Sequence, residues 1–451
     1  MPLHDSFSYT ARGRLRVPQE WLSEALLYAA YRAGGWRGVM VWRGVFAGAL
    51  VVLMGLLAVR RRAVPLVALL AVGAGAAISF PEWMARPKIV APVFAGATLL
   101  LLDAHRRGSA RAVWAIAPLL WLWANMHASF VFGVFLVFLA AAVAACRAHT
   151  RRQGTRLAVA GAAGLALAAF SPGGLRTLIN PFQYILGFGA SWGVEVFQEW
   201  QSPSFHSATG RGIELLLFML IVGLACGGWR PGAFDLLSLL AVLHLGLTSV
   251  RHSALFAVVA APLAAQAASL AWARAIEAHG PNLRALGERL SALAARLPRA
   301  AAWAACLCVS FAALALGFPR SASDQRCLAT DELPRAALQR ALALHHPGNL
   351  FNEYEWGGYI IWDSRGRLPV FVDGRADLYS ADLFHEYWTT YNGAPTWRSR
   401  FDKYNIGLVL IRRDAPLAYR LEAAPDWRLV YADALAALFA RARSNAPRRK
   451  P

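Results

Sequence analysis

The sequence predicts a mainly α protein, in which a polytopic bundle of transmembrane helices precedes a small C-terminal α/β domain. Composition is the first reason, because 57% of the 451 residues are hydrophobic and 16% are charged, against about 25% charged in an ordinary soluble domain. The second is that about ten apolar stretches lie between Arg37 and Phe318, several near the ~20 residues needed to cross a bilayer. The third is a change to soluble composition after Phe318.

These patterns divide the chain into four segments. Residues 1–36 form an outer-face segment whose Pro18 to Arg32 part reads as an amphipathic interfacial helix, residues 37–318 the transmembrane domain, residues 319–445 the α/β domain, and residues 446–451 a basic tail. The expected spans are 38–59, 64–80, 88–103, 112–126, 129–146, 156–171, 212–228, 234–249, 252–272 and 300–318.

The links between these spans alternate in character, and the alternation predicts orientation. One set of links holds 16 arginines and lysines, whereas the other holds five and is rich in Trp, Glu, Asn, Pro and His. By the positive-inside rule the first set is cytoplasmic and the second faces outward. We therefore expect a multi-pass membrane protein with its C-terminal domain on the outer side.

The same orientation places residues 1–36 on the outer side of the membrane, although they do not have the pattern of a signal peptide. We expect that a further span lies upstream of Met1. The alternative is that this short N-terminal segment is simply translocated.

The C-terminal domain shows helices and strands in alternation, as an α/β fold requires. The expected helices are Pro334 to His345, Ala381 to Tyr391 and Pro416 to Ala423, with Trp356 to Trp362 as a turn or helix. The expected strands are Leu350 to Tyr354, Pro369 to Asp373, Ile406 to Ile411 and two more between Arg428 and Arg441.

Several function classes are disfavoured. The net charge of +20 comes with only three lysines and with arginines in short loops, which favours a topological role over nucleic-acid binding. The five cysteines show neither a CxxC pair nor metal-ligand spacing. A coupled transporter would be expected to hold ionisable residues near the midplane of its spans, and the spans contain few of them.

The residues that favour chemistry lie in the outward-facing links. Arg86 and Arg251 are candidates for binding a phosphate, because a guanidinium presents a fork of donors to phosphate oxygens. Both arginines could instead hold phospholipid headgroups, and a lone histidine is more often structural than catalytic. The full set of candidate site residues is Asp5, Glu20, Arg86, His127, Glu199, Arg251 and His252.

A further run, Asn349 to Tyr379, contains Gly357-Gly358 after an aromatic residue and Asp373-Gly374-Arg375 after a strand. It shows no phosphate loop, nucleophile elbow or carboxylate pair of standard spacing. We interpret it as a docking or substrate-shaping region.

Seven motifs together resemble bacterial members of the GT-C superfamily of membrane glycosyltransferases. They are the stretch from Asp5 to Gly35, ARPK at 85–88, WLWANMHASFVFGV at 121–134, NPF at 180–182 with QEW at 198–200, SVRHSALFAVVAAP at 249–262, and VFVDGRADLY at 370–379. The resemblance implies a polyprenyl-phosphate sugar donor, an active site at the outer face, and an inverting transfer without a nucleotide sugar. It also implies a location in the bacterial inner membrane, with the C-terminal domain on the periplasmic side. The one candidate cofactor is a divalent cation such as Mg²⁺.

In such proteins an acidic residue of the first outer loop serves as catalytic base or metal ligand. Here Asp5 and Glu20 are the candidates for that role, unless the acid is lost. The resemblance thus implies sugar transfer, with Asp5 or Glu20 as base, Arg86, Arg251 and His252 at the donor phosphate, and His127 and Glu199 shaping the site. The alternative is a non-catalytic scaffold or lipid-handling protein that keeps the fold, and a transporter is the third possibility.

Overall fold

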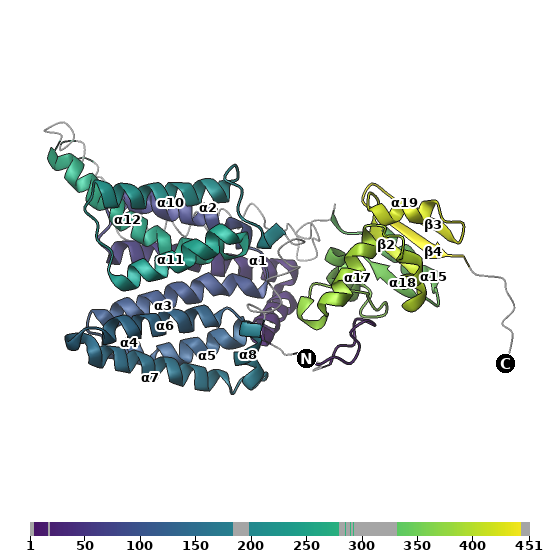
Figure 1. The fold of residues 1–451 in the computed structure, drawn as a ribbon, viewed down its shortest axis with the longest axis horizontal. Coiled ribbons are helices and arrows are strands. Elements are labelled where there is room, and N and C mark those ends of the chain that lie inside the picture. Colours follow the sequence, from purple (N-terminus) through teal and green to yellow (C-terminus); the bar gives the residue numbers. More distant parts are fainter. Residues whose placement is uncertain are drawn as a thin grey trace. The chain divides into compact units, whose positions relative to one another are not determined.

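The computed structural model describes residues 4–16, 19–183, 198–278 and 332–442, together with residues 285, 289 and 292. The chain divides into two compact units (Figure 1). We call Gln19–Asp324 the helical unit, and Met1–Pro18 with Gln325–Pro451 the mixed unit. We predicted residues 1–36 as one segment, and its bounds stay a prediction; the grouping of Met1–Pro18 with the C-terminal part agrees with the backbone bonds of Phe7 and Tyr9 to Val370.

Within the described residues, the helical unit follows the predicted spans closely. Its helices are α1 (Trp21–Arg60), α2 (Pro65–Ser79), α3 (Val90–Arg106), α4 (Ala110–Trp114), α5 (Ile116–Met126), α6 (Phe130–Ala145), α7 (Arg151–Ala168), α8 (Leu175–Gln183), α10 (Ala208–Ala225), α11 (Ala233–Thr248) and α12 (Ser253–Ala278). The predicted span at 300–318 and the tail at 446–451 lie outside the described residues.

Five helical segments of the described chain are long and apolar enough to cross a membrane: Trp21–Arg60, Pro65–Glu82, Pro87–Arg106, Ala208–Ala225 and Val250–Ala278. Helices α6 and α11 are also apolar but shorter. The predicted mainly helical membrane protein is therefore confirmed, although the length criterion supports fewer clear spans than the ten expected.

Helix α1 is two helical segments joined at Gly35. This residue has φ 57° and ψ −143°, a backbone conformation that side chains disfavour and glycine adopts readily. The break falls between the amphipathic helix and the first span that the sequence predicts.

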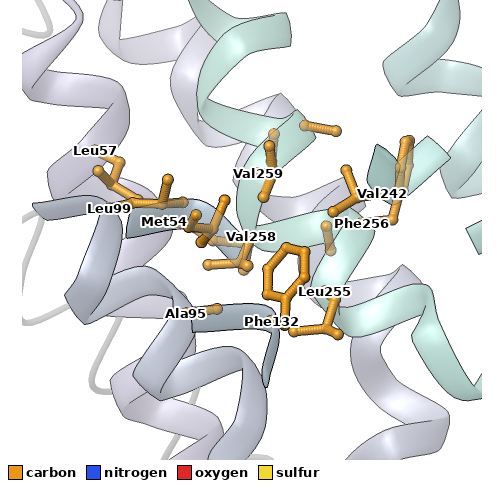
Figure 2. Packing of buried hydrophobic residues seen from close by; sticks show 14 of the residues in the cluster. Met54, Leu57, Ala95, Leu99, Phe132, Val242, Leu255, Phe256, Val258 and Val259 are labelled. Atoms are coloured by element: carbon orange, nitrogen blue, oxygen red, sulfur yellow. The ribbon is translucent and has the colours of Figure 1, made fainter. Parts of the chain in front are cut away.

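Figure 2 shows part of the packing around helix α12. From Ala254 to Ala265 this helix is apolar on all sides, as expected for a helix that neighbouring helices surround. Phe256 and Val258 are fully buried, and they pack with Met54 of α1, Ala95 of α3 and Val242 of α11. The turn at residues 249–252 leads directly into this well-buried helix.

The mixed unit contains a four-stranded sheet in the order β1-β2-β4-β3. Strands β1 (Asn349–Asn352) and β2 (Ile406–Arg412) are parallel, and the pairs of β4 (Ala436–Arg441) with β2 and with β3 (Trp427–Ala432) are antiparallel. The accompanying helices are α15 (Arg335–Leu344), α16 (Gly357–Asp363), α17 (Ala381–Tyr391), α18 (Trp397–Lys403) and α19 (Pro416–Glu422). The predicted small α/β domain is confirmed.

The prediction of a strand at Pro369 to Asp373 was wrong. Val370 forms only an isolated bridge with Ser8, and the amide side chain of Asn352 accepts from Phe371 N (2.8 Å) and donates to Val372 O (2.9 Å). The backbone groups of this segment are satisfied without joining the sheet. Helix α18, which is seven residues long, was not predicted.

Gly357 and Gly358 form a matched pair for testing the packing of the mixed unit. A Cβ at Gly357 would lie 2.4 Å from Val372 O, whereas a Cβ at Gly358 would meet nothing within 4 Å. We expect Gly357→Ala to destabilise the unit by about 1–3 kcal/mol. We expect Gly358→Ala to be neutral or slightly stabilising, since alanine suits a helix better than glycine. Hydrogen exchange of the β1 and β2 amides measures both, and equal exchange in the two variants would contradict the expectation.

Candidate functional site

The segment around Glu199 docks onto the turn between α11 and α12. The hydroxyl of Ser249, at the end of α11, donates to Glu199 O (2.9 Å) and accepts from Arg251 N (3.2 Å). Val250 N also donates to Gln201 O at 2.9 Å. These bonds place the Glu199 side chain beside that of Arg251, although the two residues are far apart in sequence.

Three cations from two links surround the Glu199 carboxylate. Arg251 forms an ion pair and a hydrogen bond with it, while Lys88 Nζ and Arg86 Nη1 lie 3.7 Å and 3.8 Å from its Oε2. Lys88 also pairs with Glu82. We call these five residues the polar cluster. Burial raises the pKa of Glu199, but Arg251, Lys88 and Arg86 outweigh burial and lower it below its usual value.

Aromatic side chains fix the orientation of Arg251. Its guanidinium lies over the ring of Trp200, 4.8 Å from the ring centroid, in a cation–π contact. The ring of His252 meets Trp200 edge to face at 6.0 Å. The Nδ1 atom of His252 is buried and has no hydrogen-bond partner among the described residues. It is therefore available to a group that enters the cluster.

His127 and Glu20 form a second part of the site. His127 Nε2 lies 3.1 Å from Glu20 Oε1, and its Nδ1 accepts a hydrogen bond from Ser129 N at 3.0 Å. A neutral ring that accepts at Nδ1 carries its proton on Nε2 and donates it to Glu20. Burial, and then the charges of Arg251 and Lys88, lower the pKa of His127 to about 3, so the ring is neutral at physiological pH.

Asp5 belongs to the mixed unit, where its carboxylate is buried and fully engaged. It accepts from Arg375 Nη1 (2.7 Å), from Ser8 N (3.0 Å) and Oγ (2.5 Å), and from Phe7 N (3.2 Å). Burial raises the pKa of Asp5, but hydrogen bonds from Ser8 and Arg375 reverse this and lower it. The structure thus assigns Asp5 and Glu20, the two predicted acids, to different units.

Four predicted residues lie together in the structure. Glu199 forms ion pairs with Arg86 and Arg251, and His252 contacts Trp200, over which Arg251 lies. The structure pairs Glu20 with His127, whose pKa responds to the cluster's charges. Sequence reasoning left Lys88 and Glu82 out of the predicted site. A signal existed, because Lys88 is one of only three lysines in the chain.

The polar cluster fits an anion better than a metal ion. Its two carboxylates are already paired with cations, since Glu82 contacts Lys88, and Glu199 contacts Arg251. In the described ranges, no three His, Cys, Asp or Glu side chains are grouped so that they could hold a metal ion. A phosphate would compete with Glu199 for Arg251 and Lys88, whereas a cation such as Mg²⁺ would meet their repulsion.

Comparison with solved structures identifies a match for the fold. The crystal structure of ArnT from Cupriavidus metallidurans bound to undecaprenyl phosphate aligns with a TM-score of 0.51 and 14% identity, over 98% of this chain and 91% of that chain. The chain is similar in fold to ArnT. No protein-family model and no curated protein matches the sequence.

The likeness to ArnT supports the predicted fold over nearly the whole length of the chain. At 14% identity it concerns the fold alone. The chemistry of this chain therefore has to be argued from its own side chains.

Proposed function

We propose that this protein is an integral membrane glycosyltransferase that transfers a sugar from a polyprenyl-phosphate donor to an acceptor at the periplasmic face. The convergence of Arg86, Lys88 and Arg251 on one carboxylate is the observation that carries the proposal. Such a group of cations suits a leaving phosphate. The likeness of the fold to ArnT, whose crystal structure holds undecaprenyl phosphate, supports the same ligand class.

In this proposal the cations act on the leaving group. The bond between the sugar's anomeric carbon and the phosphate oxygen breaks while the acceptor oxygen bonds to that carbon from the opposite side. Negative charge grows on the departing polyprenyl phosphate, and Arg251 and Lys88 stabilise it. When no donor is bound, Glu199 keeps the guanidinium of Arg251 oriented. When the donor enters, Glu199 releases Arg251 to the phosphate.

Glu20 takes the proton of the acceptor hydroxyl in the same step. His127 donates from Nε2 to Glu20, which orients the carboxylate. The neutral imidazole does not itself exchange a proton near neutral pH, because its pKa lies at about 3. His252, with its buried Nδ1 atom, lies beside the phosphate as a polar contact.

Arg251→Ala tests the donor site. We expect the variant to bind a polyprenyl phosphate at least about tenfold more weakly, since hydrogen bonds to charged groups contribute about 1.5–3 kcal/mol. Titration of the purified protein with the lipid measures this. Arg211→Ala, at an exposed arginine in the first turn of α10, is the control and should bind like the wild type. Unchanged binding by Arg251→Ala would remove Arg251 from the site.

A non-catalytic scaffold or lipid-handling protein is the second candidate, and one observation favours it. Asp5, one of the two predicted catalytic acids, is held by Arg375 and Ser8 inside the mixed unit. Only Glu20 then remains as base in the helical unit near the cluster. A scaffold would bind the lipid phosphate with the same cations and show no dependence on the Glu20 carboxylate.

A further inference from the structure

A second group of charges lies at the other end of α11 from Arg251. Asp235 is in the first turn of α11, and Arg251 follows that helix's last turn. A small cavity lies there between α1, α3, α11 and α12. Its walls include the apolar side chains of Leu57, Leu99 and Leu263. The positive-inside rule assigns this arginine-rich end to the cytoplasmic side.

The rim of this cavity has more positive than negative charge. Arg61 donates to both oxygens of Asp235, at 2.8 Å and 3.0 Å, and these two charges are matched. Asp103 accepts from Arg107 Nε at 2.8 Å and from Arg60 Nη1 at 3.3 Å. Arg60, Arg61 and Arg106 line the cavity with these two carboxylates, which leaves one positive charge in excess, and Arg107 adds a second beside Asp103.

Arg106 is the guanidinium that these carboxylates do not satisfy. Its nitrogens lie 3.6 Å from Asp103 and 4.0 Å from Asp235, beyond hydrogen-bond distance. Its guanidinium donates no hydrogen bond within the described part of the chain, and 42% of the side chain is exposed. It lies over the ring of Phe234, 5.5 Å from the centroid, so its planar fork is held at the cavity with donors available.

We propose that this basic cavity binds the phosphate headgroup of an anionic phospholipid from the adjacent leaflet. The excess positive charge and the free donors of Arg106 suit a phosphate, and the apolar wall suits the first part of an acyl chain. A soluble anion would use only the first of these features. Because the cavity is lined by four helices, a bound lipid joins them at the end away from the polar cluster.

Thermal unfolding of the full-length protein in a neutral detergent tests the proposal. Phosphatidylglycerol should raise the melting temperature, whereas phosphatidylcholine and inorganic phosphate should not. Arg106→Gln should weaken the apparent affinity for phosphatidylglycerol about tenfold or more. Arg111→Gln, at an exposed arginine of α4, is the matched control and should respond like the wild type. Arg106→Lys keeps the charge without the fork and should give an intermediate affinity.

Three outcomes would overturn the proposal. If Arg106→Gln responds to phosphatidylglycerol like the wild type, the cavity is not the binding site. If phosphatidylcholine stabilises equally, the headgroup charge is not recognised. If inorganic phosphate reproduces the full shift, the cavity takes a free anion and not a lipid. None of these results depends on sugar transfer, so the proposal and the proposed function fail separately.

Discussion

Glu20→Gln is expected to slow sugar transfer about 10²- to 10⁴-fold, the range that a positioned general base contributes. The amide has nearly the same shape as the carboxylate, so His127 can still donate to its oxygen at the distance of 3.1 Å seen here. It cannot, however, accept the proton of an acceptor hydroxyl. Donor binding should stay within about twofold of wild type, because the phosphate cations are untouched. Turnover and lipid titration on the same preparation separate the two effects.

Glu24→Gln serves as the matched control for this prediction. Glu24 lies one turn along α1 from Glu20, and its backbone N donates to Glu20 O at 2.9 Å. The control variant therefore alters a carboxylate on the same helix but not the one that His127 contacts. A Glu20→Gln variant that transfers sugar at the wild-type rate would sink the catalytic assignment. An equal loss in both variants would point to damage to α1 and not to a lost base.

Glu20→Gln and Arg251→Ala together separate the enzyme from the scaffold. A scaffold binds the lipid through Arg251 and Lys88, so its function responds to Arg251→Ala but not to Glu20→Gln. An enzyme responds to both, through donor binding in the first case and turnover in the second. The contrast rests on the geometry, because Glu20 contacts His127 and not the Glu199 carboxylate that holds the cations.

The sequence predicted the helical unit well because apolar length and arginine placement are local properties of the chain. It also singled out Arg86, Glu199 and Arg251, which come together from separate links, and their role in a site stays a prediction. It could not predict that Lys88 bridges Glu82 and Glu199, because ion pairs depend on distances between links that no periodicity encodes.

The fate of Asp5 shows a second limit. In the sequence Asp5 and Glu20 are equivalent acids ahead of the first span, and nothing local distinguishes them. The difference arises from the bond to Arg375, which lies at the other end of the chain. The segment just before Arg375, Pro369 to Asp373, was expected to be a strand, and its backbone instead bonds to Phe7 and to the side chain of Asn352. In both cases, contacts between residues far apart in the sequence determine the structure.

Asp373→Asn is expected to destabilise the mixed unit by about 3–5 kcal/mol, the cost of breaking a buried ion pair by removing one partner. Asp373 is 1% exposed and accepts from Arg375 Nε (2.8 Å), Arg375 Nη2 (2.6 Å) and the hydroxyl of Tyr379 (2.9 Å). An amide nitrogen in place of one oxygen would face these donors. Asp5 would then be the only carboxylate left to compensate the Arg375 charge.

Asp426→Asn is the control, because Asp426 pairs with Arg398 at the surface of the same unit, at 2.7 Å and 2.8 Å. An exposed pair of this kind contributes about 0–1 kcal/mol. Hydrogen exchange of the amides in residues 4–16 and 370–380, measured on the full-length chain, should accelerate strongly in Asp373→Asn and little in Asp426→Asn. Similar exchange in both variants would contradict a structural role for the Asp5–Arg375–Asp373 network.

The network also predicts how the mixed unit responds to acid. The pKa of Asp5 is lower in the folded state, because Ser8 and Arg375 more than offset the effect of burial. Its contribution to stability is therefore fully present above the unfolded value of about 3.9 and is lost as the pH falls through the folded value. Hydrogen exchange in residues 4–16 should accelerate below about pH 4 in the wild type. In Asp5→Asn, which has no carboxyl to protonate there, that part of the acid response should disappear, and an unchanged response would show that other carboxylates cause it.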